Sequence, residues 1–480
     1  MEEKKKNSVA WYILAGLYTI IAAAFLINVF RLNILPGTYF AAVAAVVVII
    51  SAIIIKSLVA GKAEKAGKKV AAVIAVILML LMGVGTWYVA GMVDFVDEIS
   101  QEKSTSVNYH VVVKMESSYE EIADLKGKTA GVMGGDDSQD KRARTQLEEQ
   151  VKIDIIEKND YLELAQGLLD GECDAILINA GLYEMALEDV DGFTEETVRI
   201  LGTIETDQAE AEKTDVETKK SRKKPDVTSD TFSVYISGID TTGSISNVSR
   251  SDVNMVVTVN PKTKKILLTS IPRDYHVVLA SKGAYDKLTH SGIYGVNETV
   301  STVENLLDMN IDYYVKVNFT TVTKLVDALG GITVNSEYSF RAGGFDFNAG
   351  LNELNGKQAL AFARERYSFA SGDNQRVRNQ QAVITGIINK ATGSTAILTS
   401  YNELLNALKE NMDTNFTSKE ITSLVKMQLS DMSSWTIETC SLSGYGNMTS
   451  VYSMPSSIVY VMEPNMDSVN AAKAKISEMM

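Results

Sequence analysis

Cysteine and histidine are scarce in this chain. Its 480 residues include two cysteines and three histidines. No pair of them has the spacing of a zinc site, and there is no CxxC motif. A metal ion bound by this protein would therefore be a hard cation held by carboxylate oxygens.

Basic residues are also too few for a nucleic-acid-binding surface. The formal net charge is -14 at pH 7, and the acidic excess lies beyond residue 90. That part has no long basic face and no basic stripe interleaved with aromatic residues, so general nucleic-acid binding is excluded. We expect no nucleic-acid partner, and we attribute the acidic excess to solubility.

Long apolar runs, in contrast, are present three times near the N-terminus. They cover residues 9–30, about 40–59 and about 70–90. Each has about the 20 residues that a helix needs to cross a bilayer, and a removed signal peptide would account for only one of them. We predict three transmembrane helices in a multi-pass plasma-membrane protein.

Lysine is distributed unevenly around these runs. Three lysines precede the first run, and five lie at or between the second and third, whereas residues 91–98 after the third run contain no basic residue. Because cytoplasmic loops are enriched in Lys and Arg, we predict a cytoplasmic N-terminus and an extracellular remainder. Its substrates would then be extracellular or carried by membrane lipid.

The outer part divides into a first α/β region and a second, larger one. Strand patterns cover residues 109–113, 128–133 and 173–178, and helical patterns cover 118–125 and 162–169. Residues 124–128 and 171–175 resemble half of a solute-binding-protein lobe, which leaves open a ligand-binding or partner-binding module or a purely accessory packing role. Residues 207–230 are charged and poor in apolar side chains, as expected of a solvated linker.

Acidic and basic side chains stand at strand ends in the second region. Asp240 follows the strand at 232–239, Arg250 and Asp252 precede the strand at 253–259, and Arg273 follows the strand at 266–271. In open α/β sheets, ligands bind beyond strand ends, where loops converge. These side chains are therefore candidates for one site.

More arginine follows a predicted helix at residues 355–362. Arg364 and Arg366 come at its end, and two positions apart on a helix do not share a face, so they converge only where the helix stops. A loop with Asp373 leads to a second helix that begins with Arg376, Arg378 and Gln380. Arginines bind phosphate oxygens and carboxylates hold Mg²⁺, so the set suits a phosphoryl group; surface ion pairs are the alternative.

An ordered series of motifs decides between these alternatives, because it resembles the LytR-CpsA-Psr family. The resemblance runs from about Thr231 to Gly393, and the motifs occupy residues 237–240, 250–252, 270–274, 287–292, 329–332, 355–360, 364–366, 372–373, 376 and 380–381. Three spans and an additional outer domain are similar to the capsule-associated CpsA branch of that family.

The sequence patterns and the resemblance together predict an α/β architecture in four parts. Residues 1–95 would form a cytoplasmic tail and three transmembrane helices, and 105–206 a small extracellular α/β accessory domain. Residues 207–230 would be the charged linker. Residues 231–480 would form an α/β/α catalytic domain with a mixed central sheet and a C-terminal extension.

The resemblance also implies a Mg²⁺-dependent phosphotransferase of the Gram-positive cell envelope. Family members move a glycopolymer, such as capsular polysaccharide or teichoic acid, from a polyprenyl pyrophosphate carrier to peptidoglycan. The partners would be the lipid-linked glycan, the peptidoglycan acceptor and membrane lipid. A polyprenyl-pyrophosphate hydrolase, and a membrane sensor or regulator of capsule synthesis, remain the alternatives; the complete set of acids and arginines favours an enzyme.

Site roles carry over from the same motifs. Asp240 and Asp252 would hold Mg²⁺; Asp252, Asp373 and Arg273 would be catalytic, with Asp252 or Asp373 accepting the proton of the attacking hydroxyl. The pyrophosphate would be bound by Arg250, Arg273, Arg364, Arg366, Arg376 and Gln380.

One departure from the family pattern concerns this clamp. Many members have arginine directly before the glutamine pair, whereas Asn379 stands there in this chain and Arg378 precedes it, so Arg376 or Arg378 could complete the clamp. The carrier tail would need an apolar groove, for which residues 332–334 and 383–388 are candidate walls or, alternatively, ordinary core.

Overall fold

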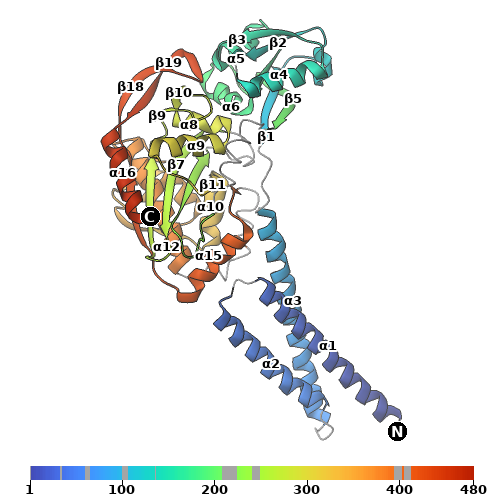
Figure 1. Ribbon diagram of the computed structural model, residues 1–480. Coiled ribbons are helices and arrows are strands. Elements are labelled where there is room, and N and C mark those ends of the chain that lie inside the picture. Colours follow the sequence, from blue (N-terminus) through green and yellow to red (C-terminus); the bar gives the residue numbers. More distant parts are fainter. Residues whose placement is uncertain are drawn as a thin grey trace. The chain divides into compact units, whose positions relative to one another are not determined.

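The computed structural model describes residues 2–32, 35–59, 65–99, 106–135, 137–207, 224–239, 249–393, 403–404 and 412–480 (Figure 1). The chain divides into two compact units. One comprises residues 1–101 together with 416–433, and the other comprises residues 102–415 together with 434–480.

The first unit contains three long helices and one shorter one. They are α1 (Glu2–Leu32), α2 (Gly37–Val59), α3 (Lys65–Ile99) and α15 (Ser418–Asp431). Three stretches, 9–31, 37–59 and 67–87, are long and apolar enough to cross a membrane. Small residues let the helices approach closely, since Ala75 is buried beside Tyr18 and Leu58. The three predicted apolar helices are confirmed.

The second unit begins with a five-stranded sheet in the order β3-β2-β4-β1-β5. Strands β3, β2 and β4 are parallel, and β1 is antiparallel to both of its neighbours. The elements are β1 (Ser106–Lys114), η1 (Ile122–Leu125), β2 (Thr129–Met133), α4 (Ser138–Gln150), β3 (Asp154–Lys158), α5 (Tyr161–Asp170), β4 (Ala175–Asn179), α6 (Ala180–Asp189) and β5 (Val198–Asp207). We call this part the accessory domain.

One sequence expectation is wrong in the accessory domain. The helix expected over residues 118–125 is only the short 3-10 turn η1. The side chain of Asp124 accepts hydrogen bonds from the backbone N–H groups of Glu120 and Glu121. These local bonds satisfy the donors that a longer helix would need, so the chain turns instead.

A six-stranded mixed sheet forms the centre of the region predicted to be the catalytic domain, a name kept here for this region, in the order β16-β11-β6-β7-β8-β17. Its middle strands β6, β7 and β8 are antiparallel, whereas β11 and β17 lie parallel to β6 and β8. The strands are β6 (Phe232–Ile239), β7 (Ser251–Asn260), β8 (Lys265–Ile271), β11 (Tyr313–Asn318), β16 (Met412–Thr414) and β17 (Thr436–Ser441).

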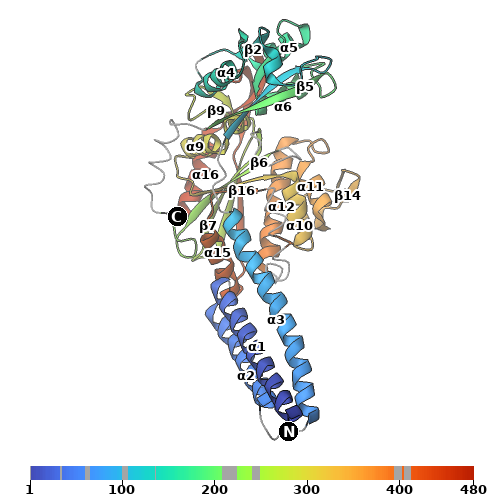
Figure 2. The same ribbon diagram turned by 90° about the vertical axis from the view of Figure 1, so that its right-hand side faces the viewer.

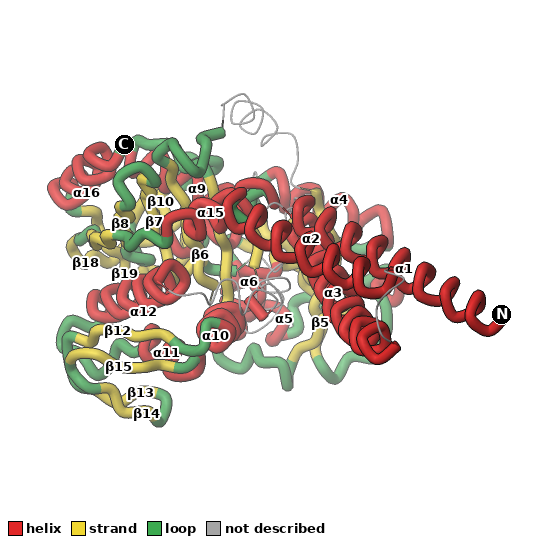
Figure 3. The backbone as a smooth tube through the Cα atoms, turned by 90° about the horizontal axis from the view of Figure 1, so that it is seen from below, coloured by secondary structure: helices red, strands yellow, loops and turns green. Residues whose placement is uncertain are grey.

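Helices cover both faces of this sheet (Figures 2 and 3). On one face lie α10 (Phe319–Ala328), α11 (Gly356–Arg364) and α12 (Asp373–Gly393); on the other lie α9 (Val296–Leu307) and α16 (Met466–Met479). The predicted α/β/α architecture with a mixed sheet is confirmed. Asn355 and Gln358 form a capping box that starts α11.

Smaller elements surround the sheet. The connections from β8 to α9 contain β9 (His276–Val278), β10 (Tyr285–Lys287), α8 (Leu288–Ser291) and η2 (Gly292–Tyr294). Between α10 and α11, β12 (Ile332–Ser336) pairs with β15 (Gly350–Leu354), and the hairpin of β13 (Phe340–Ala342) and β14 (Phe345–Phe347) lies between them in the chain.

The C-terminal hairpin joins the two domains of the second unit. It pairs β18 (Gly444–Val451) with β19 (Met454–Pro464). Val451, Met454 and Val461 from this hairpin are buried in the same apolar cluster as Leu164 and Tyr183 of the accessory domain. The accessory domain therefore shares a hydrophobic core with the catalytic domain.

Candidate pyrophosphate site

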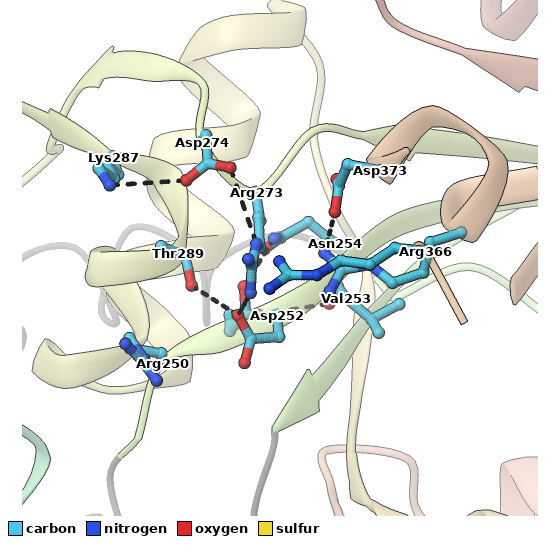
Figure 4. A network of polar contacts seen from close by, with 12 residues as sticks. Arg250, Asp252, Val253, Asn254, Arg273, Asp274, Lys287, Thr289, Arg366 and Asp373 are labelled. Atoms are coloured by element: carbon cyan, nitrogen blue, oxygen red, sulfur yellow. Dashed lines mark hydrogen bonds and ion pairs between the residues drawn. The ribbon is translucent and has the colours of Figure 1, made fainter. Parts of the chain in front are cut away.

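The site is built first from the ends of two adjacent strands. Asp252 stands at the start of β7, and Arg273 follows the end of its antiparallel neighbour β8. Arg273 NH1 donates a hydrogen bond to Asp252 Oδ1 at 2.8 Å, and Thr289 Oγ1 donates to the same oxygen at 3.3 Å (Figure 4). The strand register thus brings together an acid and an arginine that are distant in sequence.

Two charged residues that the sequence reasoning did not assign also belong to this cluster. The side chain of Asp274 lies 3.7 Å from Arg273 Nε and 3.7 Å from Lys287 Nζ. Figure 4 shows Lys287, Asp274 and Arg273 in one chain of ion pairs. Asp274 and Lys287 stand within the family motifs at 270–274 and 287–292, which was the signal available in the sequence.

The end of α11 supplies two further arginines in different directions. Arg364 is its last residue, and its guanidinium carbon lies 4.3 Å from the centre of the Phe319 ring. The next residue, Glu365, is extended (φ -68°, ψ 129°), so the chain leaves the helix there. Arg366 then points toward Arg273 and Asp252 (Figure 4).

Helix α12 presents an ion pair to the same place. Asp373 is its first residue, and Arg376 NH2 lies 2.5 Å from Asp373 Oδ1. Burial lowers the pKa of Arg376, and the neighbouring cations Arg273 and Arg366 lower it further, against the opposing effect of Asp373. Three guanidinium groups therefore lie together in a partly desolvated place, beside the carboxylates of Asp252 and Asp373.

Two nitrogen atoms in this cluster are left without hydrogen-bond acceptors. Arg273 Nε and Arg376 Nε are buried and have no hydrogen-bond partner among the described residues. Buried N–H groups are normally satisfied, so an anion that accepts from either of them would lower this cost. This is the strongest indication in the geometry that the site binds phosphate oxygens.

Arg378 does not take part in the cluster. It follows Arg376 by two positions and therefore lies on another face of α12. Its Nε donates to Gln375 Oε1 at 3.0 Å and lies 3.2 Å from Glu337. Asn379 is buried and donates to the carbonyl of Phe362. Of the two candidate arginines, the structure brings Arg376 to the site.

Arg250 lies beside Asp252 but is held by the accessory domain. Its NH2 donates to Glu188 Oε2 at 2.7 Å. Burial alone would lower the pKa of Arg250, but the carboxylates of Asp252 and Glu188 outweigh it, so the pKa is raised. The guanidinium is therefore firmly charged and sits between two acids.

An apolar cavity lies on the face of the sheet that α10, α11 and α12 cover. Its volume is about 310 Å³, and it lies between strands β6, β7 and β11 and helices α10, α11 and α12. Arg364 and Gln380 line it together with Val383, Ile384, Ile387 and Ile388. Of residues 383–388, these four thus form a cavity wall, whereas Ile332 and Val334 are buried in a hydrophobic core.

The predicted metal ligands are only partly within the described residues. Asp240 lies outside them, and among the residues that the structure describes no group of three or more His, Cys, Asp or Glu is placed to hold a metal ion. Both hydrogen bonds to Asp252 fall on Oδ1, and Oδ2, which points away from Arg273 in Figure 4, accepts none from the described chain. One carboxylate oxygen is thus free for a hard cation.

Comparison with known protein families gives a match over the catalytic domain and the strand before it. The model of the LytR_cpsA_psr family matches residues 199–474, more than half of the chain. This chain belongs to the LytR_cpsA_psr family. A second model, described as DNA polymerase processivity factor, matches residues 64–178. That range begins beside α3 and ends inside the five-stranded sheet, so it follows no structural unit and supports no function.

Several curated relatives of this LytR_cpsA_psr protein are teichoic acid transferases named TagU. The polyisoprenyl-teichoic acid–peptidoglycan teichoic acid transferase TagU of Bacillus licheniformis is 43% identical over 189 residues, which are 39% of this chain and 61% of the relative. TagU of Enterococcus faecalis is 40% identical over 187 residues, 38% of this chain and 61% of the relative. The match thus spans about three fifths of the length of these relatives.

Solved structures of the same kind are also similar. The crystal structure of Bacillus subtilis TagU is 35% identical and covers 52% of this chain and 96% of that chain, with a TM-score of 0.42. TagT bound to LI-WTA is 30% identical and covers 54% of this chain and 94% of that chain, with a TM-score of 0.43.

Proposed function

We propose that this protein transfers a glycopolymer from a polyprenyl pyrophosphate carrier to peptidoglycan outside the cell. The observation that carries the proposal is the buried, unsatisfied Nε of Arg273 and of Arg376 beside Asp252. Two guanidinium groups with free donors suit the paired phosphates of a pyrophosphate. The names of the TagU relatives support a teichoic-acid-like polymer as the cargo; a capsular polysaccharide is the other polymer class that the sequence predicts.

The residues divide the work of phosphoryl transfer. Arg273, Arg366 and Arg376 would bind the pyrophosphate oxygens and stabilise the negative charge that moves to the leaving phosphate. Asp252 or Asp373 would accept the proton of the attacking hydroxyl. The hydroxyl oxygen bonds to the phosphorus that carries the glycan, the bond to the bridging oxygen breaks, and polyprenyl phosphate leaves.

Mg²⁺ is part of the proposal. A bound Mg²⁺ would neutralise charge on the pyrophosphate oxygens. Asp252, through its free Oδ2, and Asp240 would hold it.

The apolar cavity supports a lipid carrier. Its wall is formed by side chains such as Ile384 and Ile387, and Arg364 and Gln380 line it as well. With the polyprenyl tail of the carrier bound in this cavity, the pyrophosphate at its end would bind at the arginine cluster. Such a cavity suits the first isoprene units of a polyprenyl tail.

Orientation completes the proposal. Lysine flanks the cytoplasmic side of the three apolar helices in the predicted topology, which leaves the catalytic domain outside the plasma membrane. There it would meet both the lipid-linked polymer and the peptidoglycan acceptor.

The test uses the full-length protein in lipid nanodiscs with a polyprenyl pyrophosphate-linked glycan and Mg²⁺. Release of polyprenyl phosphate is followed with and without peptidoglycan fragments. We expect release, with joining of the glycan to the acceptor, that EDTA abolishes and that Asp252→Ala and Arg366→Ala reduce at least about 100-fold.

A matched substitution outside the cluster serves as the control for Arg366→Ala. Arg378→Ala removes an arginine from another face of α12 and is expected to keep activity within about threefold. Release of polyprenyl phosphate without joining of the glycan to peptidoglycan would indicate a hydrolase. Absence of both release and lipid binding would contradict an enzymatic function and favour a sensor or regulator.

A further inference from the structure

Helix α6 of the accessory domain ends beside a candidate phosphate-binding arginine. Glu188, in its last turn, accepts the hydrogen bond from Arg250 NH2 at 2.7 Å. The two side chains are 62 positions apart in sequence. The side chain of Arg250 is 24% exposed and that of Glu188 is 61% exposed, so the pair lies at an opening of the site.

Among the described residues, this contact occupies one of the three guanidinium nitrogens. NH2 of Arg250 binds Glu188, whereas Nε and NH1 have no hydrogen-bond partner within the described part of the chain. A guanidinium carries five N–H donors in one planar fork. Arg250 can therefore be held by Glu188 on one side while it presents its remaining donors to a phosphate.

The start of the same helix is fixed against the backbone of Arg250. A Cβ atom on Gly181 would lie 3.0 Å from Ile293 Cγ2, and one on Gly292 would lie 2.5 Å from the carbonyl oxygen of Ser249 and 2.7 Å from the nitrogen of Ser251. Gly292 and Ile293 are neighbours in η2. Helix α6 thus contacts η2, which contacts the backbone on both sides of Arg250.

The N-terminal ends of helices α4 and α5 of the accessory domain also contact the catalytic domain. Asp137, the N-cap of α4, pairs with Lys282, and Glu163 in the first turn of α5 accepts a hydrogen bond from Ser456 at 3.4 Å. These helix N-termini follow the parallel strands β2, β3 and β4, and the carboxyl edge of such strands is where α/β sheets usually bind ligands. Here the catalytic domain fills that edge.

We propose that the accessory domain is a fixed part of the pyrophosphate site and that Glu188 is a positioning residue for Arg250. This inference rests on the function proposed above. Glu188 fixes one nitrogen of the guanidinium. Arg250 therefore meets the pyrophosphate of the lipid-linked glycan in one orientation and loses less conformational entropy when the pyrophosphate binds.

A double-mutant cycle tests the inference in the full-length protein. The variants are Glu188→Ala, Arg250→Ala and the double variant, with kcat and KM for the lipid-linked glycan and the Kd for Mg²⁺ pyrophosphate as readouts. We expect Glu188→Ala to weaken binding and kcat/KM about tenfold, and to have no further effect once Arg250 is absent. Glu188→Gln keeps an oxygen acceptor and should recover most of the loss.

Glu184→Ala is the matched control. Glu184 lies one turn earlier on α6 and carries the same charge, but no hydrogen bond joins it to Arg250 in the described structure. Its substitution is expected to change kcat/KM less than twofold. Thermal unfolding of each variant shows that it is folded.

Several results would overturn the inference. They are additive losses in the cycle, tighter pyrophosphate binding by Glu188→Ala, or equal effects of Glu184→Ala and Glu188→Ala. If the unmodified protein binds Mg²⁺ pyrophosphate without transferring polymer, the proposed function is wrong, and the double-mutant cycle is then evaluated from the Kd values alone. If the protein transfers polymer and the effects of Glu188→Ala and Arg250→Ala are additive, only the inference about Glu188 is wrong.

Discussion

The carboxyl group of Asp140 lies where helix α4 meets strand β1. Tyr109 donates a hydrogen bond to Asp140 Oδ1 at 2.7 Å. Burial and the neighbouring charge of Asp137 raise the pKa of Asp140 to about 6, against the opposing effects of the Tyr109 hydrogen bond and of Lys282. Ionisation of Asp140 above this pH therefore costs folding free energy.

This pKa predicts the pH dependence of stability. Because the folded pKa exceeds the unfolded value of 3.8, protonated Asp140 stabilises the fold fully below about pH 4, and this contribution is lost as the pH rises through about 6. We expect Asp140→Asn to raise the Tm by several degrees at pH 7.5 and to leave it unchanged at pH 4.

The measurement is thermal unfolding of the full-length protein between pH 4 and pH 8. Asp154→Asn is the control, because Asp154 is exposed and makes no side-chain hydrogen bond in the described structure. Equal Tm differences between Asp140→Asn and the unmodified protein at both pH values would contradict the prediction.

Helix α12 organises the site because its faces have different tasks. Its first turn contributes Asp373 and Arg376 to the cluster of arginines and aspartates. Ile384 and Ile387 farther along line the apolar cavity, and Thr385 faces a separate polar cavity. In the proposed function, a single rigid element would thus fix the distance between the pyrophosphate site and the site of the lipid tail.

The apolar face of α12 gives a prediction about the length of the polyprenyl chain of the donor. Ile387→Asn places an amide in the apolar cavity, and an unpaired polar group there weakens binding of an apolar chain. We expect the KM for a long-chain polyprenyl donor to rise about tenfold, while the Kd for Mg²⁺ pyrophosphate stays within twofold.

Thr385→Asn introduces the same side chain on the polar side of α12 and is the control for Ile387→Asn. It should leave both constants unchanged. If Ile387→Asn weakened short-chain and long-chain donors equally, the cavity would not be the site of the tail.

At the scale of the whole molecule, the predicted topology places the two ends of α3 on opposite sides of the membrane. Lys62 stands in the lysine-rich segment before α3, and Ser104 follows that helix. We expect a membrane-impermeant maleimide to label Ser104→Cys in intact cells, and to label Lys62→Cys only after permeabilisation.

The protein without an introduced cysteine is the control for labelling. Cys173 is buried and Cys440 is half-buried, so little background is expected. Labelling of Lys62→Cys in intact cells would reverse the topology and remove the extracellular acceptor from the proposed function.

Much of the fold follows from local sequence pattern. The strands at residues 232–239 and 266–271 and the helix that starts after Asn355 lie where their apolar runs and capping residues predict them. The helix expected at residues 118–125 fails because one aspartate side chain binds the local backbone, a competition that hydrophobic periodicity does not record.

The sequence by itself determined the three apolar helices, the alternation of strands and helices, and the family, because these depend on composition, periodicity and ordered motifs along the chain. Only the tertiary structure decided that Arg376 and not Arg378 joins Arg273, and that Glu188 binds Arg250. Periodicity gives the relative angle of two side chains on a helix, but packing against the sheet and the neighbouring domain decides which of them faces the site.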